Sequence, residues 1–314
     1  MMPGVTTPGP ATPGVTTPGP ATQGEATTGP ATPKVALTIA GSDSGGGAGI
    51  QADLKTFAAL GVHGTCAVTA VTAQNTTAVL AVVAVAPDMV AAQVEAVVTD
   101  LVPAAVKTGM LANPAIVAAV ADLAAAGALP NLVVDPVLVS TSGHLLMDEG
   151  GVEAYRALLL PHATVVTPNL REAAVLTGRR FEDLATVEAM TAAAEDLRAL
   201  GSTTVVVKGG HADEAGAPGD VGSPDVIVGP AGVVVLQADR VRTTNDHGTG
   251  CSLSAAIAAH LALGASPVEA IERAKALVRW ALAGAAGWQL GAGHGPIDHF
   301  GWSAADPGGA TGPP

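Results

Sequence analysis

The chain has 314 residues, of which 48% are hydrophobic and 13% are charged, and its formal net charge is -13 at pH 7. Its 27 aspartates and glutamates outnumber its 14 lysines and arginines. No basic surplus exists that could neutralise a nucleic-acid backbone or an anionic lipid surface. The composition therefore argues against nucleic-acid and membrane partners.

The mean hydropathy of +0.43 raises the question of a membrane span. A span needs about 18 consecutive apolar residues, and the longest uncharged candidate, Cys251 to Val268, contains serines, a histidine, a glycine and a proline. This segment is more typical of a buried helix beside a turn. The two cysteines, Cys66 and Cys251, lie far apart, so we expect neither a disulfide nor a thiolate zinc site and predict a cytoplasmic protein.

Both ends of the chain are rich in proline, glycine, threonine and alanine. Residues 3–12 and 13–22 are identical copies of Pro-Gly-Val-Thr-Thr-Pro-Gly-Pro-Ala-Thr, and a degraded third copy follows. A repeat without a hydrophobic face cannot form a packed core. An inert extension is the favoured interpretation, and a partner-binding or modified tail is the alternative. We predict a disordered tail over 1–33, a single folded domain over 34–302 and a second disordered tail over 303–314.

Between the tails, short β-branched runs alternate with alanine-rich helical stretches. This alternation predicts an α/β fold with a central, mostly parallel sheet and helices on both of its faces. Such folds bind ligands beyond the carboxyl ends of their strands. In chain order we expect a strand over 35–40, a helix over 48–60, strands over 66–72 and 79–85, a helix over 87–101, a strand over 105–107, a helix over 114–126, strands over 132–135 and 164–166, a helix over 187–200, a strand over 204–208, a hairpin near 226–237, and helices over 250–263 and 267–286.

The first glycine-rich loop, Gly41 to Gly49, follows a predicted strand and opens a predicted helix. Glycines let the backbone approach a ligand closely, and a helix start offers free N–H groups to an anion. The loop matches neither the dinucleotide-binding spacing nor a Walker A loop. By itself the loop is a weak signal, and a tight turn is the favoured interpretation.

A second loop, Asn245 to Cys251, also opens a long predicted helix. Its consecutive backbone N–H groups could form an anion-binding concavity. We expect the positive end of the helix to lower the pKa of the Cys251 thiol, so that a thiolate could accept a proton. The alternative is a small packing cysteine behind a flexible turn.

A third loop places Lys208 at the end of a predicted strand, directly before Gly209 and Gly210. The chain has few lysines, and one beside two glycines at the carboxyl end of a strand is suited to contact a phosphate. A solvated surface lysine is the alternative.

Together these loops resemble those of the ribokinase-like kinases, and among them the hydroxymethylpyrimidine and phosphomethylpyrimidine kinases of thiamine biosynthesis. The resemblance covers nearly all of residues 35–302 and implies a ribokinase-like fold. It rests on LTIAGSD at 37–43, GGAGIQADLKTF at 46–57, TAQNT at 72–76, KTGML at 107–111, TPNLREA at 167–173, KGGH at 208–211, HGTGC at 247–251 and GHGPIDHF at 293–300.

The resemblance implies ATP-dependent phosphorylation of 4-amino-5-hydroxymethyl-2-methylpyrimidine, and then of its monophosphate to the diphosphate. It makes Cys251 the catalytic base, at a position where many sugar kinases of this superfamily have an aspartate. Gly248, Thr249 and Gly250 would form the anion hole, and Lys208 would hold the phosphates of ATP. The implied cofactors are ATP and Mg²⁺, and the implied assembly is a homodimer.

For the metal, Asn169 and Glu172 match the magnesium-associated motif of the superfamily. Mg²⁺ keeps several waters and needs few carboxylates, so Glu172 is chemically suitable. The same pair also fits a helix N-cap, and both roles can coexist. Asp135, at the end of the strand Leu132-Val133-Val134, is a weaker metal or phosphate-site candidate.

For the pyrimidine, Gln74 is the strongest candidate because its amide offers a donor and an acceptor to a ring nitrogen and its neighbouring amine. A polar residue ending a strand is the alternative. By resemblance Gly41, Asp53, Met110 and Val137 would complete the substrate pocket. The last two could sandwich the flat ring, although core packing would explain them as well, and Asp53 could instead be a solvated helix residue.

The sequence departs from its relatives at two places. Ser44 follows Asp43 where relatives commonly have a proline, and residues 140–143 lack a lysine that some relatives carry. Two other functions remain open: a pyridoxal or pyridoxine kinase, and a noncatalytic ligand-binding protein that kept the fold.

Overall fold

The computed structural model describes residues 32–138, 147, 149–210, 214–215, 222 and 224–303. The two predicted tails therefore lie outside the described residues, except for residues 32–33 and 303. Residues 140–143 and His211 of the third loop also lie outside them.

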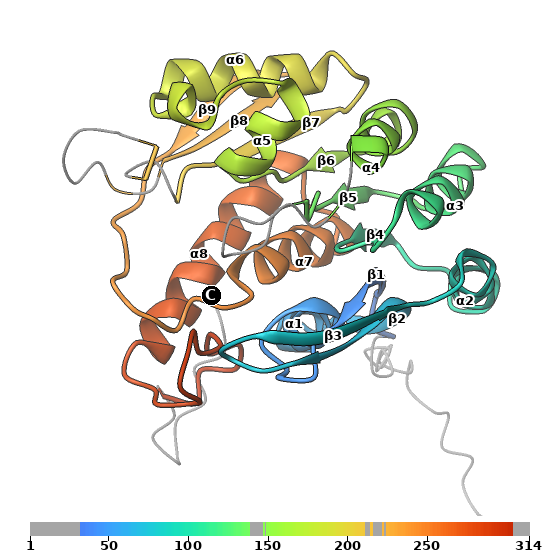
Figure 1. Ribbon diagram of the computed structural model, residues 1–314, viewed down its shortest axis with the longest axis horizontal. Helices are drawn as coiled ribbons and strands as arrows, with labels where there is room; N and C mark the ends of the chain where they lie inside the picture. The colour runs from blue at the N-terminus through green and yellow to red at the C-terminus, as the bar shows by residue number, and fades with distance from the viewer. Residues whose placement is uncertain are drawn as a thin grey trace, which may run out of the picture. The chain divides into compact units, whose positions relative to one another are not determined.

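The described strands form one nine-stranded sheet with the order β3-β2-β1-β4-β5-β6-β7-β8-β9. From β2 to β7 all neighbours are parallel, and β3, β8 and β9 join antiparallel at the two edges. The predicted mostly parallel sheet is thus confirmed (Figure 1). The strands are β1 (Val35–Ser42), β2 (His63–Gln74), β3 (Val79–Ala84), β4 (Ala105–Thr108), β5 (Leu132–Val134), β6 (Val165–Val166), β7 (Thr204–Lys208), β8 (Asp225–Gly229) and β9 (Gly232–Leu236).

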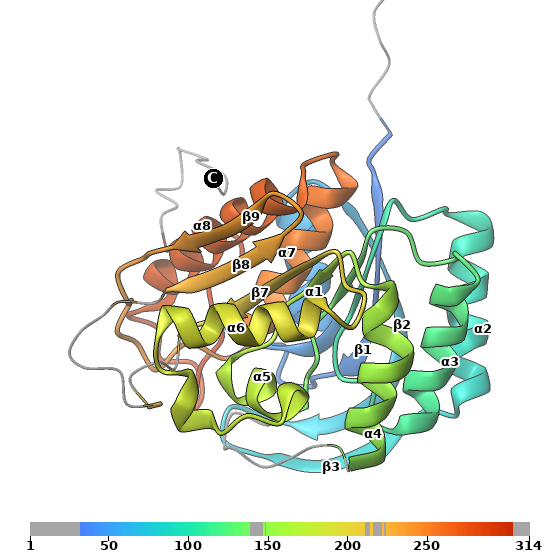
Figure 2. The ribbon, with the colours of Figure 1, turned by 90° about the horizontal axis from the view of Figure 1, so that it is seen from above.

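Helices cover both faces of this sheet, as predicted. The helices α1, α7 and α8 pack on one face, and α2 to α6 pack on the other (Figure 2). The helices are α1 (Gly49–Ala59), α2 (Pro87–Asp100), α3 (Pro114–Ala125), α4 (Glu149–Ala154), α5 (Leu170–Thr177), α6 (Val187–Arg198), α7 (Thr249–Ala262) and α8 (Pro267–Ala285).

The two cores follow from the alternation of side chains along each strand. Consecutive residues of β4, Ala105 and Val106, belong to the α1/α7/α8 core and to the α2–α6 core, respectively. Both residues are fully buried. Because both faces are covered, a strand such as β5 (Leu-Val-Val) is apolar along its whole length instead of alternating with polar residues, whereas β4 ends with the buried polar residues Lys107 and Thr108.

Several helices begin at side chains suited to capping. Asn113 accepts a hydrogen bond from the Ile116 N–H in front of Pro114, and Ser266 forms a capping box with Glu269. These contacts satisfy N–H groups that have no partner within the helix. None of the helices among the described residues is long and apolar enough to cross a bilayer.

Two described helices were absent from the sequence-based expectation. The helix α4 contains Gly150 and Gly151, which weaken any helical signal, and it continues as a π-helical turn, Tyr155–Leu159. The helix α5 is short, although its Asn169 and Glu172 cap was recognised as a possibility. Both helices bury apolar side chains in the core that lies between the α2–α6 layer and the sheet. This tertiary burial stabilises the two helices, which their local helix propensity does not.

Candidate active site

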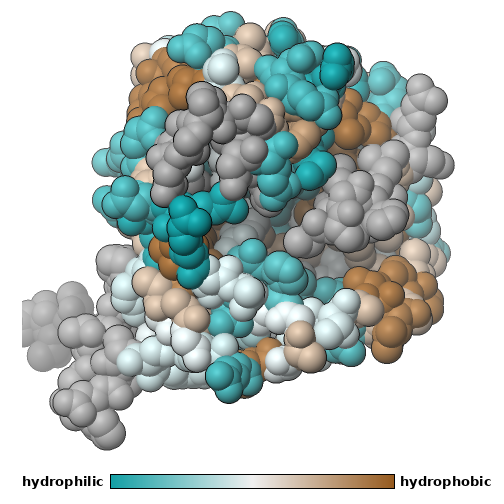
Figure 3. Space-filling model, turned by 60° about the vertical axis from the view of Figure 1, so that its left-hand side comes forward, coloured by the Kyte–Doolittle hydropathy of each residue, from teal (hydrophilic) through white to brown (hydrophobic). Residues whose placement is uncertain are grey.

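A pocket of about 990 Å³ lies at the carboxyl ends of the parallel strands. Figure 3 views this side of the molecule and shows a hollow with hydrophilic side chains on its rim. The predicted site residues that line the pocket are Gly41, Gln74, Met110, Asp135, Val137, Asn169, Glu172, Lys208, Gly248, Thr249, Gly250 and Cys251. Asp53 is not among the lining residues.

Asp43 organises the first glycine-rich loop. Its carboxylate accepts hydrogen bonds from the backbone N–H groups of Gly45, Gly47 and Ala48 at 2.8 to 3.0 Å. Burial opposes ionisation, but the hydrogen bonds from His247 and from these N–H groups outweigh it and lower the pKa of Asp43 to about 2. Asp43 is therefore a permanent anion that fixes the loop around itself.

His247 joins this loop to the end of β2. Its Nε2 lies 3.0 Å from Oδ2 of Asp43 and 3.2 Å from the amide of Gln74. Because ionised Asp43 can only accept, Nε2 of His247 must carry a proton. The structure places the amide nitrogen of Gln74 against this protonated Nε2, where neither atom can accept a hydrogen bond. Because the oxygen and nitrogen of an amide are assigned from their hydrogen bonds, we assign the facing atom as the oxygen. This orientation leaves the NH₂ group of Gln74 for a ligand.

The second loop starts α7 with Gly248 in a left-handed conformation, φ 82°. A side chain at this position would collide with the carbonyl oxygen of Gly47, so the two glycine-rich loops can meet only through glycine. No side chain caps this helix, and its first residues line the pocket. The Thr249 N–H contacts the Asp246 carbonyl at 3.3 Å. The helix start thus presents backbone donors and a positive dipole to the pocket.

Cys251 stands near the starts of two helices, because the Gly49 N–H at the beginning of α1 also hydrogen-bonds its sulfur. The expectation of a lowered pKa for Cys251 is nevertheless wrong. Burial dominates and raises the pKa of the Cys251 thiol to about 11, although Lys107 and the Gly49 N–H act against it. A thiol is therefore the main form at neutral pH.

Lys208 lies at the end of β7, with 15% of its side chain exposed. Its ammonium is 3.1 Å from Oδ1 of Asp135, which also accepts a hydrogen bond from Thr167, while Oδ2 accepts one from Ser254 of α7. Despite burial, Lys208 and Lys107 keep the pKa of Asp135 below its ordinary value. The cation is thus fixed at the pocket wall.

Glu172 and Asn169 form the predicted capping box of α5. Asn169 accepts from the Glu172 N–H at 2.9 Å, and Glu172 accepts from the Asn169 N–H at 2.8 Å. Burial and the nearby charge of Asp135 raise the pKa of Glu172 to about 8, although Lys208 lowers it. A cation next to the two carboxylates would relieve their repulsion, so these side chains fit a magnesium ion.

No group of three or more His, Cys, Asp or Glu residues suited to hold a metal occurs among the described residues. A magnesium ion here would therefore depend on phosphate oxygens and water for its remaining ligands. This is the usual coordination of Mg²⁺ in nucleotide sites.

Met110 and Val137 lie in the apolar part of the pocket wall. A Cβ atom added to Gly41 would come within 2.5 Å of the terminal methyl group of Met110. The glycine therefore makes room for the methionine. Met110 and Val137 both line the pocket, and their contact with a flat ring stays a prediction.

Asp53 lies behind the pocket instead of in it. It is fully buried on α1, where it accepts hydrogen bonds from Thr38 at 2.6 Å and from Lys107 at 2.8 Å. Lys107 does line the pocket. The sequence reasoning overlooked the roles of Lys107, Asp43 and His247, although all three lie within motifs that carried the resemblance.

Phosphoryl transfer needs positioned cations and N–H donors more than a covalent partner on the protein. Around one pocket, the sheet supplies Lys208 and α7 supplies its N-terminus. This fold and site define a small-molecule kinase of the ribokinase-like class. The chain belongs to the phosphomethylpyrimidine kinase family, whose model matches residues 43–298.

Known proteins agree with this assignment. The hydroxymethylpyrimidine/phosphomethylpyrimidine kinase of Rhizobium meliloti (strain 1021) is 50% identical over 268 residues, which cover 85% of this chain and 97% of that protein. Among solved structures, an ADP complex of Bacillus subtilis pyridoxal kinase superposes with a TM-score of 0.76 at 38% identity, covering 85% of this chain and 98% of that one. A phosphomethylpyrimidine kinase from Clostridium difficile 630 gives 0.67 at 39% identity, covering 78% and 98%.

Proposed function

We propose that this chain transfers the γ-phosphoryl group of ATP to the hydroxymethyl oxygen of 4-amino-5-hydroxymethyl-2-methylpyrimidine, and then phosphorylates the monophosphate to the diphosphate. The observation that carries the proposal is the convergence of Cys251, Lys208 and the start of α7 in the same pocket as Gln74. Family membership and the name of the Rhizobium meliloti relative support the choice of substrate.

In the first transfer, the thiolate form of Cys251 accepts the proton of the hydroxymethyl group. The oxygen attacks the γ-phosphorus, the bond to the β-phosphate oxygen breaks, and ADP leaves. Backbone N–H groups at the start of α7 and the ammonium of Lys208 stabilise the charge on the transferring group. In the second transfer, a phosphate oxygen of the monophosphate is the attacking atom, and it needs no base once it is ionised.

Magnesium bound near Glu172 and Asp135 would neutralise charge on the nucleotide phosphates. Glu172 would be a magnesium ligand while it also caps α5. Asn169 would support the metal site indirectly, because its backbone N–H fixes the Glu172 carboxylate. The pyrimidine would lie between Met110 and Val137 and accept a hydrogen bond from the NH₂ group of Gln74. His247 fixes that amide in the required orientation.

A pyridoxal kinase is the second candidate, because Bacillus subtilis pyridoxal kinase shares the fold at 38% identity. A six-membered ring with a hydroxymethyl substituent is common to both substrate classes. A homodimer and a cytoplasmic location also remain proposals. They rest on the family resemblance and on the two free cysteines, Cys66 and Cys251.

Mass spectrometry of the products made from ATP, magnesium and the hydroxymethylpyrimidine tests the proposal. We expect both the monophosphate and the diphosphate, and a parallel reaction with pyridoxal should proceed far more slowly. A clear preference for pyridoxal would support the second candidate. Binding of the pyrimidine without formation of ADP would instead identify a noncatalytic binding protein.

A further inference from the structure

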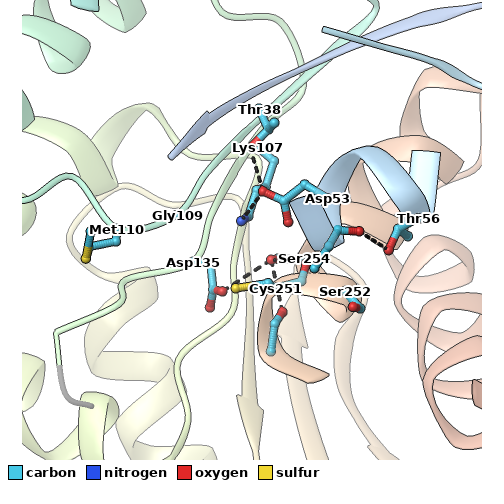
Figure 4. Close-up of polar contacts among 12 residues, drawn as sticks. Thr38, Asp53, Thr56, Lys107, Gly109, Met110, Asp135, Cys251, Ser252 and Ser254 are labelled. Carbon is cyan, nitrogen blue, oxygen red and sulfur yellow. Dashed lines mark hydrogen bonds and ion pairs between the residues drawn. The ribbon is translucent and has the colours of Figure 1, made fainter. Parts of the chain in front are cut away.

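An ion pair between Lys107 of β4 and Asp53 of α1 lies directly behind Cys251. The side chains of both residues are fully buried, and Nζ of Lys107 is 2.8 Å from Oδ2 of Asp53. Thr38 of β1 donates a second hydrogen bond to the same oxygen. Figure 4 shows the three side chains converging from three elements of the fold.

This pair is poorly explained by stability alone. Removing two charges from water is unfavourable before their attraction is counted. In addition, Oδ1 of Asp53 is buried without a hydrogen-bond partner, which leaves its loss of hydration uncompensated. A pair retained at this cost beside a pocket is a candidate for a functional role.

Several neighbouring groups fix the position of the Lys107 ammonium. Lys107 lines the pocket although none of its side chain is accessible to water. A Cβ atom added to Gly109 would come within 2.8 Å of Nζ of Lys107, so the absence of a side chain there leaves room for the ammonium. In Figure 4, Cys251 extends from α7 into the space bounded by Lys107 and Asp135.

Four charged groups act on the Cys251 thiol. Lys107 and Lys208 favour the thiolate, and Asp53 and Asp135 oppose it. Lys208 is in direct contact with Asp135. Of all these groups, Lys107 acts most strongly on the pKa of Cys251, after burial itself. Asp53, Cys251 and Asp135 outweigh burial and raise the pKa of Lys107, so its ammonium stays charged at any working pH.

We propose that Lys107 is a positioning residue for the reaction, whose ammonium, held in place by the Asp53 carboxylate to which Thr38 also donates, stabilises the thiolate of Cys251. The thiol loses its proton to solvent through the pocket, and the thiolate regains one from the substrate hydroxyl. The inference rests on the proposed role of Cys251 as the base. It gives the buried pair of Lys107 and Asp53 a chemical role.

The test measures the reactivity of the Cys251 thiol in the absence of any substrate. In a Cys66→Ser background, the rate at which iodoacetamide alkylates Cys251 is followed between pH 7.5 and 9.5, with the site identified by peptide mass spectrometry. Below the pKa the rate is proportional to the thiolate fraction. We expect Lys107→Met to lower the rate about tenfold at each pH, which corresponds to a rise of one pKa unit.

A second variant separates this role from a structural one. Lys107→Met leaves the charge of Asp53 unpaired, and the double variant Asp53→Asn/Lys107→Met removes both charges. If Lys107 serves only to neutralise Asp53, the double variant should recover the alkylation rate of the parent. If Lys107 stabilises the thiolate, the double variant should remain slow. Recovery of the parental rate would overturn the proposal, including in the case that Lys107→Met fails to fold.

Turnover supplies an independent readout. In both variants we expect kcat to fall while KM for ATP changes little, because the variants leave Lys208 and the start of α7, the proposed phosphate contacts, unchanged. Slow alkylation with full turnover would leave the effect of Lys107 on the thiol intact and refute Cys251 as the base. Failure of the inference and failure of the proposed function are thus distinguishable.

Discussion

The carboxylate of Asp43 and the imidazole of His247 are in contact at 3.0 Å, although 204 positions separate them in the chain. The contact ties the loop after β1 to the loop before α7. Nε2 of His247 also faces the amide of Gln74 at 3.2 Å. The proton on this nitrogen therefore determines whether the oxygen or the NH₂ group of the amide faces the ligand. The orientation of a recognition residue is therefore set by two loops that are distant in sequence.

Replacing His247 by leucine should weaken pyrimidine binding, because the Gln74 amide loses the donor that orients it. One lost hydrogen bond of this kind is worth about 1 to 1.5 kcal/mol, so we expect KM for the pyrimidine to rise about tenfold. KM for ATP should change less. His247→Gln, which keeps an N–H donor, is the matched control and should retain most of the affinity. An equal loss in both variants would exclude the orienting role.

Cys251→Ala should lose most of the turnover and leave pyrimidine affinity largely unchanged, because the thiol acts mainly in the chemical step.

With the pKa of Cys251 raised to about 11 by burial, wild-type kcat for the hydroxymethyl substrate should increase as the pH rises from 7 to 9. Steady-state kinetics and calorimetric binding check both expectations. Cys66→Ala, which changes the other cysteine on β2, should retain full activity. Unchanged turnover in Cys251→Ala would show that Cys251 is a packing residue and not the base.

Much of the fold was predictable because its signals are local. Runs such as Val205 to Val207 are buried on both faces and are therefore continuously apolar, so they indicate parallel strands directly. The glycine-rich loops that follow such strands likewise predicted the pocket edge. The helix α4 was missed because Gly150 and Gly151 carry no local helical signal.

The parts of the site that escaped prediction depend on tertiary contacts. Asp53 was expected in the substrate pocket, but the packing of α1 on β1 buries it against Lys107 of β4. The pKa of Cys251 was expected to fall, because a helix start is visible in the sequence whereas the extent of burial is not. Pairings between residues 54 positions apart, such as Asp53 with Lys107, follow from strand order and not from any motif.

Gly248→Ala should abolish activity through the geometry of the two loops. The new Cβ would collide with the Gly47 carbonyl, in addition to the strain of a left-handed residue. Gly264, at the other end of α7, also has a positive φ of 93° but no atom near its missing Cβ. Gly264→Ala therefore measures the backbone strain alone, about 1 kcal/mol of stability, and should keep its turnover. If Gly248→Ala and Gly264→Ala lose activity equally, the contact between the two loops does not explain the loss in Gly248→Ala.

Glu172→Gln should make the folding stability of the protein less dependent on pH. Burial, together with the charge of Asp135, raises the pKa of Glu172 from 4.5 to about 8 in the folded chain. Between these values the unfolded chain has released the proton that the folded chain still holds, so folding stability falls as the pH rises from 4.5 to 8.

The neutral amide of the variant removes this contribution and keeps the shape of the side chain. Thermal unfolding at pH 5.5 and at pH 8 measures the effect without any ligand. We expect the variant to gain stability over the wild type at pH 8, by at most about 4 kcal/mol, with a smaller difference at pH 5.5. The variant should also lose activity at both pH values because the carboxylate is suited to magnesium. A variant that is less stable than the wild type at pH 8 would show that the capping contact with Asn169 outweighs the buried charge.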